Sequence, residues 1–198
     1  MDDQGAPPAG RPHAAGCGIE RIWRRQGAAD PQRDRAWGRR LTPTVYRIGT
    51  NKARTLQDLS YGSTLEAGRW HLTAPDGLPV VYAGGSRAIC QLEKRVHCNG
   101  VPPINLIMLA LQLPAGAPLQ TLTDLDTALL IDWIDRPTST QDIGVAWRKS
   151  GSGLGLWVPS AVEPDELNLI LNPSHPAYGS IVLTVVRDPF AFDPRMFD

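Results

Sequence analysis

A run of ten residues from Ile104 to Leu113, with the sequence INLIMLALQL, is almost entirely apolar. Such a run is typical of a central strand that is covered on both faces of its sheet. Gly100 and the pair Pro102-Pro103 precede the run and end the element before it. The sequence therefore predicts a sheet whose inner strand is buried on both sides.

The other predicted elements do not follow a regular alternation of strand and helix. Alternating or apolar β-rich segments predict strands over 44–48, 78–83, 154–158, 168–171 and 180–187. One helix is predicted from Ser86 as N-cap, with Ala88, Ile89, Leu92 and Val96 at helical spacing. Further helices are expected over 125–134 and over 140–149, the latter capped by Thr140. This mixture predicts an α+β fold.

Length and composition indicate a single globular domain. The chain has 198 residues, 42% hydrophobic and 20% charged, with a formal net charge of zero. A neutral chain argues against direct nucleic-acid binding as its main role. No apolar run approaches the ~18–20 residues of a membrane span, and no signal peptide is apparent. An odd count of three cysteines argues against a disulfide framework, so we expect a reducing, cytoplasmic location.

Residues 1–40 differ in charge from the rest of the chain. They hold eight arginines and five acidic residues, whereas the remaining 158 residues hold 12 basic and 15 acidic residues. Few apolar residues repeat within this segment, so it lacks the surface that would offset the entropy of ordering. We expect a basic, disordered arm over 1–40 and one folded domain over 41–198.

Several common catalytic and binding motifs are missing or out of context. The glycines of 151–155 precede a predicted strand instead of opening a helix, which argues against a dinucleotide-binding turn. There is no GxxxxGK phosphate loop, and the four histidines lack metal-ligand spacing. Ser174-His175 lacks the strained turn of a serine nucleophile. We therefore expect neither a metal site nor a serine-type triad.

The candidate functional residues are polar side chains that lie among apolar neighbours. Each of these residues also has an ordinary structural interpretation. Arg47, for example, could point to solvent from an edge strand, and Glu93 could lie on the solvent-exposed face of its helix. The candidates are Arg47, Arg69, Trp70, Tyr82, Glu93, Ser160, Asn172 and His175.

Taken together, these residues match a family in order and surroundings. The chain resembles the RES-domain proteins, the toxin partners of Xre-type antitoxins, which are named after a shared Arg, Glu and Ser. Arg69 or Arg47, Glu93 and Ser160 supply these residues here. The resemblance covers roughly 44–197 and departs from the family where His71 replaces the commoner Asn. The matching segments are YRI (46–48), GRWH (68–71), PVVYAGGSRAICQLE (79–93), TQDIGVAW (140–147), VPSAV (158–162), NLILNPSHP (168–176) and FDPRMF (192–197).

The resemblance implies an ADP-ribosyltransferase-like mixed sheet with flanking helices, and cleavage of NAD⁺ at the nicotinamide–ribose bond. NAD⁺ is then a substrate, and no resident cofactor is expected. The departing nicotinamide leaves positive charge on the ribose, which a carboxylate stabilises, and Glu93 takes this role. The guanidinium group of arginine can donate two parallel hydrogen bonds to a phosphate, which suits binding of the NAD⁺ pyrophosphate.

The other roles follow from the same resemblance. Arg47 and Arg69 are the candidates for the pyrophosphate. Tyr82 or Trp70 would stack on nicotinamide, and Ser160 would orient the ribose or the nicotinamide amide. Asn172 and His175 complete the expected NAD⁺ site.

The resulting hypothesis is a toxin of a bacterial type II toxin–antitoxin system. We expect it to transfer ADP-ribose to a cellular protein, such as a nucleotide-biosynthesis enzyme, and to be inhibited by a cognate Xre-type antitoxin. The alternative is an NAD⁺ glycohydrolase or phosphorylase that depletes NAD⁺ without modifying a protein. A non-catalytic binding module is a rival of another class, and it is disfavoured because every motif residue is present.

Overall fold

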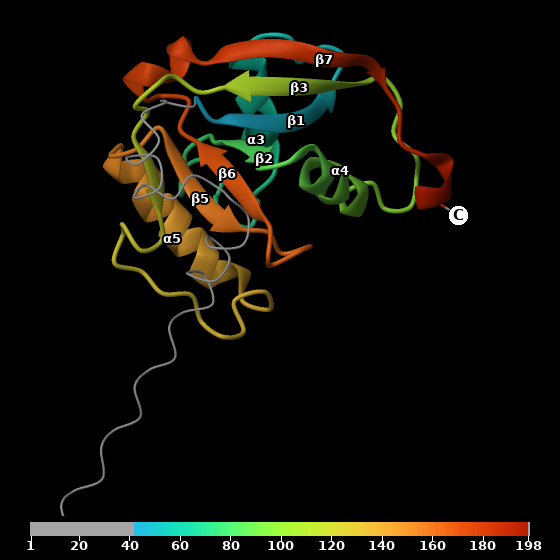
Figure 1. The fold of residues 1–198 in the computed structure, drawn as a ribbon. Helices are drawn as coiled ribbons and strands as arrows, with labels where there is room; N and C mark the ends of the chain where they lie inside the picture. The colour runs from blue at the N-terminus through green and yellow to red at the C-terminus, as the bar shows by residue number, and fades with distance from the viewer. Residues whose placement is uncertain (1–41, 198) are drawn as a thin grey trace, which may run out of the picture. The chain divides into compact units, whose positions relative to one another are not determined.

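The computed structural model of the protein describes residues 42–197. This part of the chain forms one seven-stranded sheet in the order β4-β5-β6-β2-β1-β3-β7 (Figure 1). Neighbouring strands are antiparallel except β4 and β5, which are parallel. The strands are β1 (Thr44–Thr50), β2 (Val81–Gly84), β3 (Leu106–Gln112), β4 (Leu119–Thr121), β5 (Gly155–Pro159), β6 (Leu167–Leu171) and β7 (Val182–Phe190).

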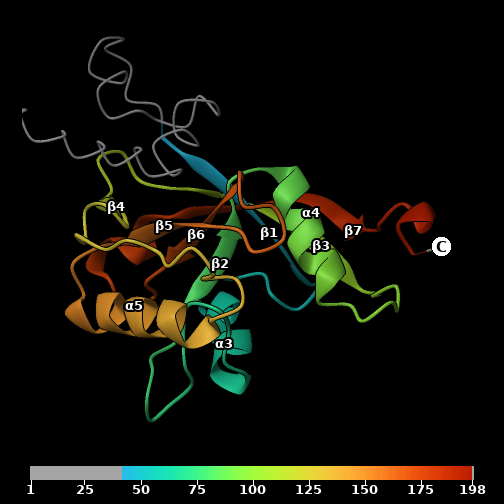
Figure 2. The ribbon, with the colours of Figure 1, turned by 90° about the horizontal axis from the view of Figure 1, so that it is seen from below.

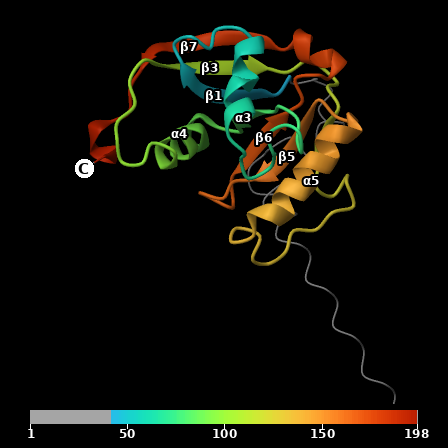
Figure 3. The ribbon, with the colours of Figure 1, turned by 180° about the vertical axis from the view of Figure 1, so that it is seen from behind.

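Helices pack against this sheet and confirm the predicted α+β class. The α-helices are α3 (Tyr61–Leu65), α4 (Arg87–Val96) and α5 (Pro137–Ser150). The short 3-10 helices are η1 (Gln57–Ser60), η2 (Pro176–Ser180) and η3 (Pro194–Met196). Figures 1 and 3 show β5 and β6 lying between α4 and α5. No helix within residues 42–197 is long and apolar enough to cross a membrane.

The sheet has two parts that are joined where β1 meets β2. Strand β1 pairs with β3 along its whole length, from Thr44–Gln112 to Thr50–Leu106. It pairs with β2 through a single register pair, Tyr46–Gly84. In Figure 1, β1, β3 and β7 accordingly form one group, and β2, β6 and β5 form another.

Strand β3 is buried on both faces, as its apolar run predicted. Alternating side chains of a strand point to opposite faces of the sheet. Leu109 and Leu111 belong to a large core cluster that includes Val81 and Leu169. Met108 belongs to a smaller cluster with other residues on the opposite face. Those residues are Ile48, Cys90, Leu106 and Phe190.

Helix α4 begins as predicted but presents a different face to the sheet. The Ser86 hydroxyl oxygen accepts a hydrogen bond from the Ile89 backbone N–H at 3.2 Å, which confirms the predicted N-cap. Ile89 and Cys90 are buried, whereas Leu92 and Val96 are 39% and 55% exposed. The buried face therefore includes the side of the helix from which Glu93 projects.

The helix predicted over 125–134 is wrong. These residues form successive turns, and Asp126 has a left-handed backbone with φ of 49°. The Asp124 carboxylate accepts hydrogen bonds from the Thr121 N–H and hydroxyl, which favours a local turn over a helix. Trp133 is buried and packs against Trp70, with ring centroids 6.1 Å apart. Tertiary packing of this tryptophan and local turn formation override the apolar pattern.

Helix α5 begins one turn earlier than predicted. Its first residue is Pro137, which suits the first helical turn because its missing N–H would have no helical partner. Thr140 is therefore not the N-cap. Its buried hydroxyl donates to the Arg69 and Pro137 carbonyl oxygens at 2.7 and 2.9 Å. The predicted arm over 1–40 lies outside the described residues.

Candidate active site

The candidate site lies on the face of β2, β6 and β5 between α4 and α5 (Figure 2). Tyr82 and Gly84 are two residues apart on β2 and share this face. Asn168 of β6 lies opposite Gly84, and Val158 of β5 lies opposite Asn168. Ser160, two residues after Val158, continues the same face. Residues from three strands therefore meet on this face.

Glu93 reaches this face from the second half of α4. Its Oε1 atom accepts hydrogen bonds from the Ser160 hydroxyl at 2.7 Å and from Asn168 Nδ2 at 2.5 Å. The Ser160 hydroxyl oxygen in turn accepts from the backbone N–H groups of Val162 and Glu163 at 3.0 and 3.1 Å. Ser160 is fully buried. Two of the three residues that name the predicted family are thus in direct contact.

The Tyr82 hydroxyl is the centre of a second hydrogen-bond cluster. It accepts from the Trp70 backbone N–H at 3.0 Å and lies 2.9 Å from His71 Nδ1. His71 Nε2 lies 3.1 Å from the carbonyl oxygens of Ser63 and Glu66, so this nitrogen carries the hydrogen. Nδ1 is then an acceptor, to which the Tyr82 hydroxyl donates.

Charged residues surround this phenol. Burial raises the pKa of Tyr82 above its ordinary range, and the Glu93 carboxylate raises it further. The Trp70 N–H and the charges of Arg69 and Arg47 act in the opposite direction. The tyrosine therefore stays protonated and lies within electrostatic range of three of the predicted site residues.

Arg47 lies where β1 and β2 meet and bridges these strands. Its Nη1 donates to the Tyr82 carbonyl oxygen at 2.6 Å, while its Nε is buried and has no hydrogen-bond partner within the described residues. Burial lowers the pKa of Arg47, and the nearby Cys90, Tyr178 and Tyr82 offset part of this effect. Within residues 42–197 no carboxylate lies within 4 Å of its guanidinium. An unpaired donor of this kind suits an anionic ligand.

Arg69 and Trp70 are held by the loop before α5. Arg69 Nη1 donates to the Ile134 carbonyl oxygen at 2.8 Å, and its guanidinium lies 5.7 Å from the centre of the Trp133 ring. Trp70 is only 2% exposed, so its ring has no free face on which a ligand could stack. Tyr82, which is partly exposed, is the stacking candidate that the structure leaves accessible.

The structure does not bring Asn172 and His175 to this cluster. Asn172 lies four residues beyond Asn168, a separation of about 13 Å along a strand. Its side-chain oxygen accepts from the Ser174 N–H at 2.9 Å, and His175 Nδ1 accepts from the Ala177 N–H at 3.1 Å. Both side chains thus stabilise the turn after β6, and their expected contact with NAD⁺ stays a prediction.

Sequence reasoning missed Asn168 and His71 as members of the cluster. Asn168 is the polar residue near the start of an otherwise apolar strand, in the same segment that supplied Asn172. The position of His71 could not be interpreted without knowing that Tyr82 lies beside it. Both residues join the cluster through contacts with segments that are distant in sequence. Asn168 meets Glu93, and His71 meets Tyr82.

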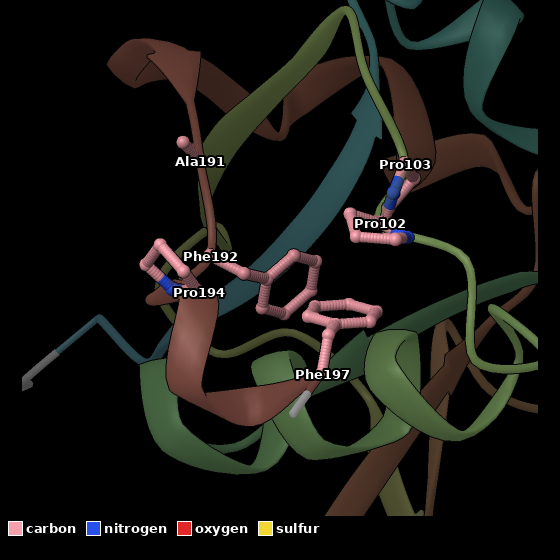
Figure 4. Close-up of a pocket in the computed structure, with 6 residues that line it drawn as sticks. All are labelled: Pro102, Pro103, Ala191, Phe192, Pro194 and Phe197. Carbon is pink, nitrogen blue, oxygen red and sulfur yellow. The ribbon is translucent and has the colours of Figure 1, made fainter.

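The C-terminal segment supports the helix that carries Glu93. Arg95 of α4 donates from Nε to the Met196 carbonyl oxygen at 2.6 Å and lies over the Phe197 ring at 4.1 Å. A hollow of about 340 Å³ adjoins this contact, and the rings of Phe192 and Phe197 pack edge to face beside it (Figure 4). Its lining is Pro102, Pro103, Ala191, Phe192, Pro194 and Phe197, so it offers no side-chain cation to a phosphate.

Two other kinds of chemistry have little support in the described residues. Within 42–197 no group of three His, Cys, Asp or Glu side chains could hold a metal ion. Burial raises the pKa of the Cys90 thiol to about 11, so this residue is not a thiolate nucleophile at neutral pH.

Comparison with known proteins identifies the family to which this arrangement belongs. The family model described as the RES domain matches residues 44–193. The chain therefore belongs to the RES-domain family.

Several characterised relatives are similar over most of their length. The "Prs ADP-ribosylating toxin" of Sphingobium sp. (strain YBL2) is 35% identical over 79% of this chain and 98% of its own. The "Toxin Res" of Yersinia enterocolitica is 31% identical over 77% of this chain and 98% of its own. The crystal structure of the M. tuberculosis MbcT-MbcA toxin-antitoxin complex contains a chain with the same fold. Its TM-score is 0.58, with 19% identity over 78% of this chain and 86% of that chain.

Proposed function

We propose that this RES-domain protein is a toxin that cleaves NAD⁺ at the nicotinamide–ribose bond and transfers ADP-ribose to a cellular protein. One observation carries the proposal: the Glu93 carboxylate is held by two donors, and Glu93, Arg47 and Arg69 all lie within electrostatic range of Tyr82. Neither arginine has an acidic partner in the described residues. This arrangement supplies negative charge for a ribose cation and guanidinium groups for phosphates. The name of the Sphingobium relative supports ADP-ribosylation as the outcome.

The proposed reaction assigns a role to each group. When the bond between ribose C1′ and the nicotinamide nitrogen breaks, the electron pair leaves with nicotinamide. The positive charge that develops on the ribose is stabilised by Glu93, which also accepts a hydrogen bond from a ribose hydroxyl. Arg47, whose buried Nε has no hydrogen-bond partner among the described residues, binds the pyrophosphate together with Arg69. A nucleophile of the acceptor then bonds to C1′ and loses its proton.

NAD⁺ enters this proposal as a substrate, and the protein needs no resident cofactor. The partly exposed Tyr82 ring provides an aromatic surface for nicotinamide, and its hydroxyl is fixed by Trp70 and His71. We propose further that a cognate Xre-type antitoxin inhibits the protein in the cytoplasm by covering the surface around Glu93. The fold shared with a chain of a toxin–antitoxin complex supports an antitoxin partner.

The test uses the full chain and NAD⁺ that carries a label in its adenylate half. Transfer predicts label on one or a few protein bands in lysate and slow loss of NAD⁺ in buffer, because a water-excluding site disfavours hydrolysis. Rapid loss in buffer that responds to phosphate and labels no band would instead favour the glycohydrolase or phosphorylase. No consumption of NAD⁺ under either condition would refute the proposed function. Added antitoxin should block both NAD⁺ binding and turnover.

A further inference from the structure

The two oxygens of the Glu93 carboxylate have different surroundings. Oε1 accepts both side-chain hydrogen bonds, from the Ser160 hydroxyl and from Asn168 Nδ2. No donor to Oε2 is found among the described residues, and Glu93 is partly exposed. One oxygen is therefore anchored to the protein, while the other remains able to accept a hydrogen bond from a ligand.

The identity of the donors follows from hydrogen-bond chemistry. An ionised carboxylate only accepts, so the Asn168 atom that faces it must be the amide nitrogen. The Ser160 oxygen already accepts from the Val162 and Glu163 N–H groups, which leaves its own hydrogen for Glu93. Both contacts therefore point toward Oε1, and both involve a charged acceptor, which makes them stronger than neutral hydrogen bonds.

The sheet register explains why Asn168 can reach Glu93. Asn168 lies directly opposite Gly84 on the adjacent strand. A Cβ atom on Gly84 would come within 2.8 Å of Ile89 Cγ2 and 2.9 Å of the Cys90 backbone nitrogen. The missing side chain therefore lets α4 lie close to the sheet, at a distance from which Glu93 meets the strand residue beside Gly84.

We propose that Asn168 is a positioning residue that, together with Ser160, fixes the Glu93 carboxylate through Oε1 and leaves Oε2 to face the ribose of NAD⁺. The inference rests on the proposed function of Glu93. Asn168 acts through Glu93 and makes no contact with NAD⁺ in this account. Its removal should therefore lower the rate of turnover and leave substrate binding nearly unchanged.

The first test measures NAD⁺ consumption by Asn168→Leu and Asn168→Asp. We expect kcat to fall roughly 10- to 100-fold, the size expected for losing one hydrogen bond to a charged group. KM for NAD⁺ should change less than about twofold, because removing a transition-state interaction leaves ground-state binding intact. Asn168→Asp keeps the side-chain shape but places a second carboxylate against Glu93, so its kcat should fall at least as far as that of the leucine variant. Asn168→Ala, which only deletes the amide, carries the test if the leucine variant does not fold. Asn51→Asp, an exposed amide-to-carboxylate change in the turn that follows β1, is the matched control and should retain the wild-type rate.

The second test repeats Asn168→Leu in a Glu93→Gln background. A residue that acts only through the Glu93 charge should then lower kcat by less than about twofold, whereas a merely structural role would lower it in both backgrounds. An unchanged kcat for Asn168→Leu in an enzyme that consumes NAD⁺ would overturn this inference alone. A wild-type chain that does not consume NAD⁺ would overturn the proposed function, and the inference with it.

Discussion

At the level of single residues, the charge of Glu93 is the feature on which the proposed chemistry depends most. Glu93→Gln keeps an oxygen that can accept from Ser160 and Asn168, so we expect the fold to be retained. NAD⁺ consumption should fall about 10²- to 10³-fold, as when one electrostatic group that stabilises a transition state is removed. Glu66→Gln removes an exposed carboxylate elsewhere and should have no such effect. Full turnover by a folded Glu93→Gln protein would refute the assignment.

His71 makes the stability of the fold depend on pH. Burial lowers the pKa of His71, although its contacts with the Ser63 and Glu66 carbonyl oxygens partly oppose this effect. Above about pH 6.5, the ordinary histidine pKa, both the folded and the unfolded chain hold it neutral. As the pH falls below this value, the unfolded chain binds a proton more readily than the folded chain, so stability is lost. Denaturant unfolding between pH 7.5 and 5.5 should show a shallower decline in the free energy of unfolding for His71→Asn than for the wild type.

At the level of secondary-structure elements, Gly84 sets the distance between α4 and the sheet. In Gly84→Ala the new Cβ meets the backbone nitrogen of Cys90, which cannot move without moving the helix. We expect a loss of about 1–3 kcal/mol in the free energy of unfolding, as in overpacked cores, and reduced NAD⁺ turnover as Glu93 is displaced. Gly62→Ala is the matched control, because nothing lies within 4 Å of its Cβ position. Equal stability of the two variants in urea would contradict this account.

The elements that sequence predicted correctly are those in which local pattern and tertiary packing agree. The apolar run of β3 and the Ser86 cap of α4 are examples. The predicted helix over 125–134 failed because Trp133 packs on Trp70 and because Asp124 closes a turn. Similarly, apolar spacing could not reveal that Leu92 lies outside the buried face of α4, since that face is set by contact with Gly84.

At the level of the whole molecule, the candidate site depends on how distant segments are aligned. The resemblance to a family supplied Glu93 and Ser160 as candidates, and the structure brings them into contact. It did not supply Asn168, because only the register of β6 against β2 and β5 places that residue beside Glu93. The same register puts Asn172 just beyond the other end of β6. A single sequence does not reveal how strands are aligned. This explains why Asn168 was not predicted and why Asn172 was grouped with Glu93 although the structure holds the two apart.

The junction between the two parts of the sheet gives the last prediction. Arg47 spans this junction through its bond to the Tyr82 carbonyl oxygen and keeps one buried donor without a partner in the described residues. If the pyrophosphate of NAD⁺ is the missing partner, NAD⁺ at 100 times its Kd should stabilise the wild type by about 2.7 kcal/mol and raise its Tm.

Arg47→Met removes the buried charge and keeps much of the side-chain length, so its Tm without NAD⁺ should stay within about 4 °C of the wild type. Its Tm should no longer rise with NAD⁺. Arg47→Lys keeps the charge but lacks the planar fork, so a smaller rise is expected. A methionine variant that NAD⁺ still stabilises fully would place the phosphate site elsewhere. Loss of the rise in a variant that is otherwise as stable as the wild type would show that this guanidinium serves binding and is not needed to hold the two parts of the sheet together.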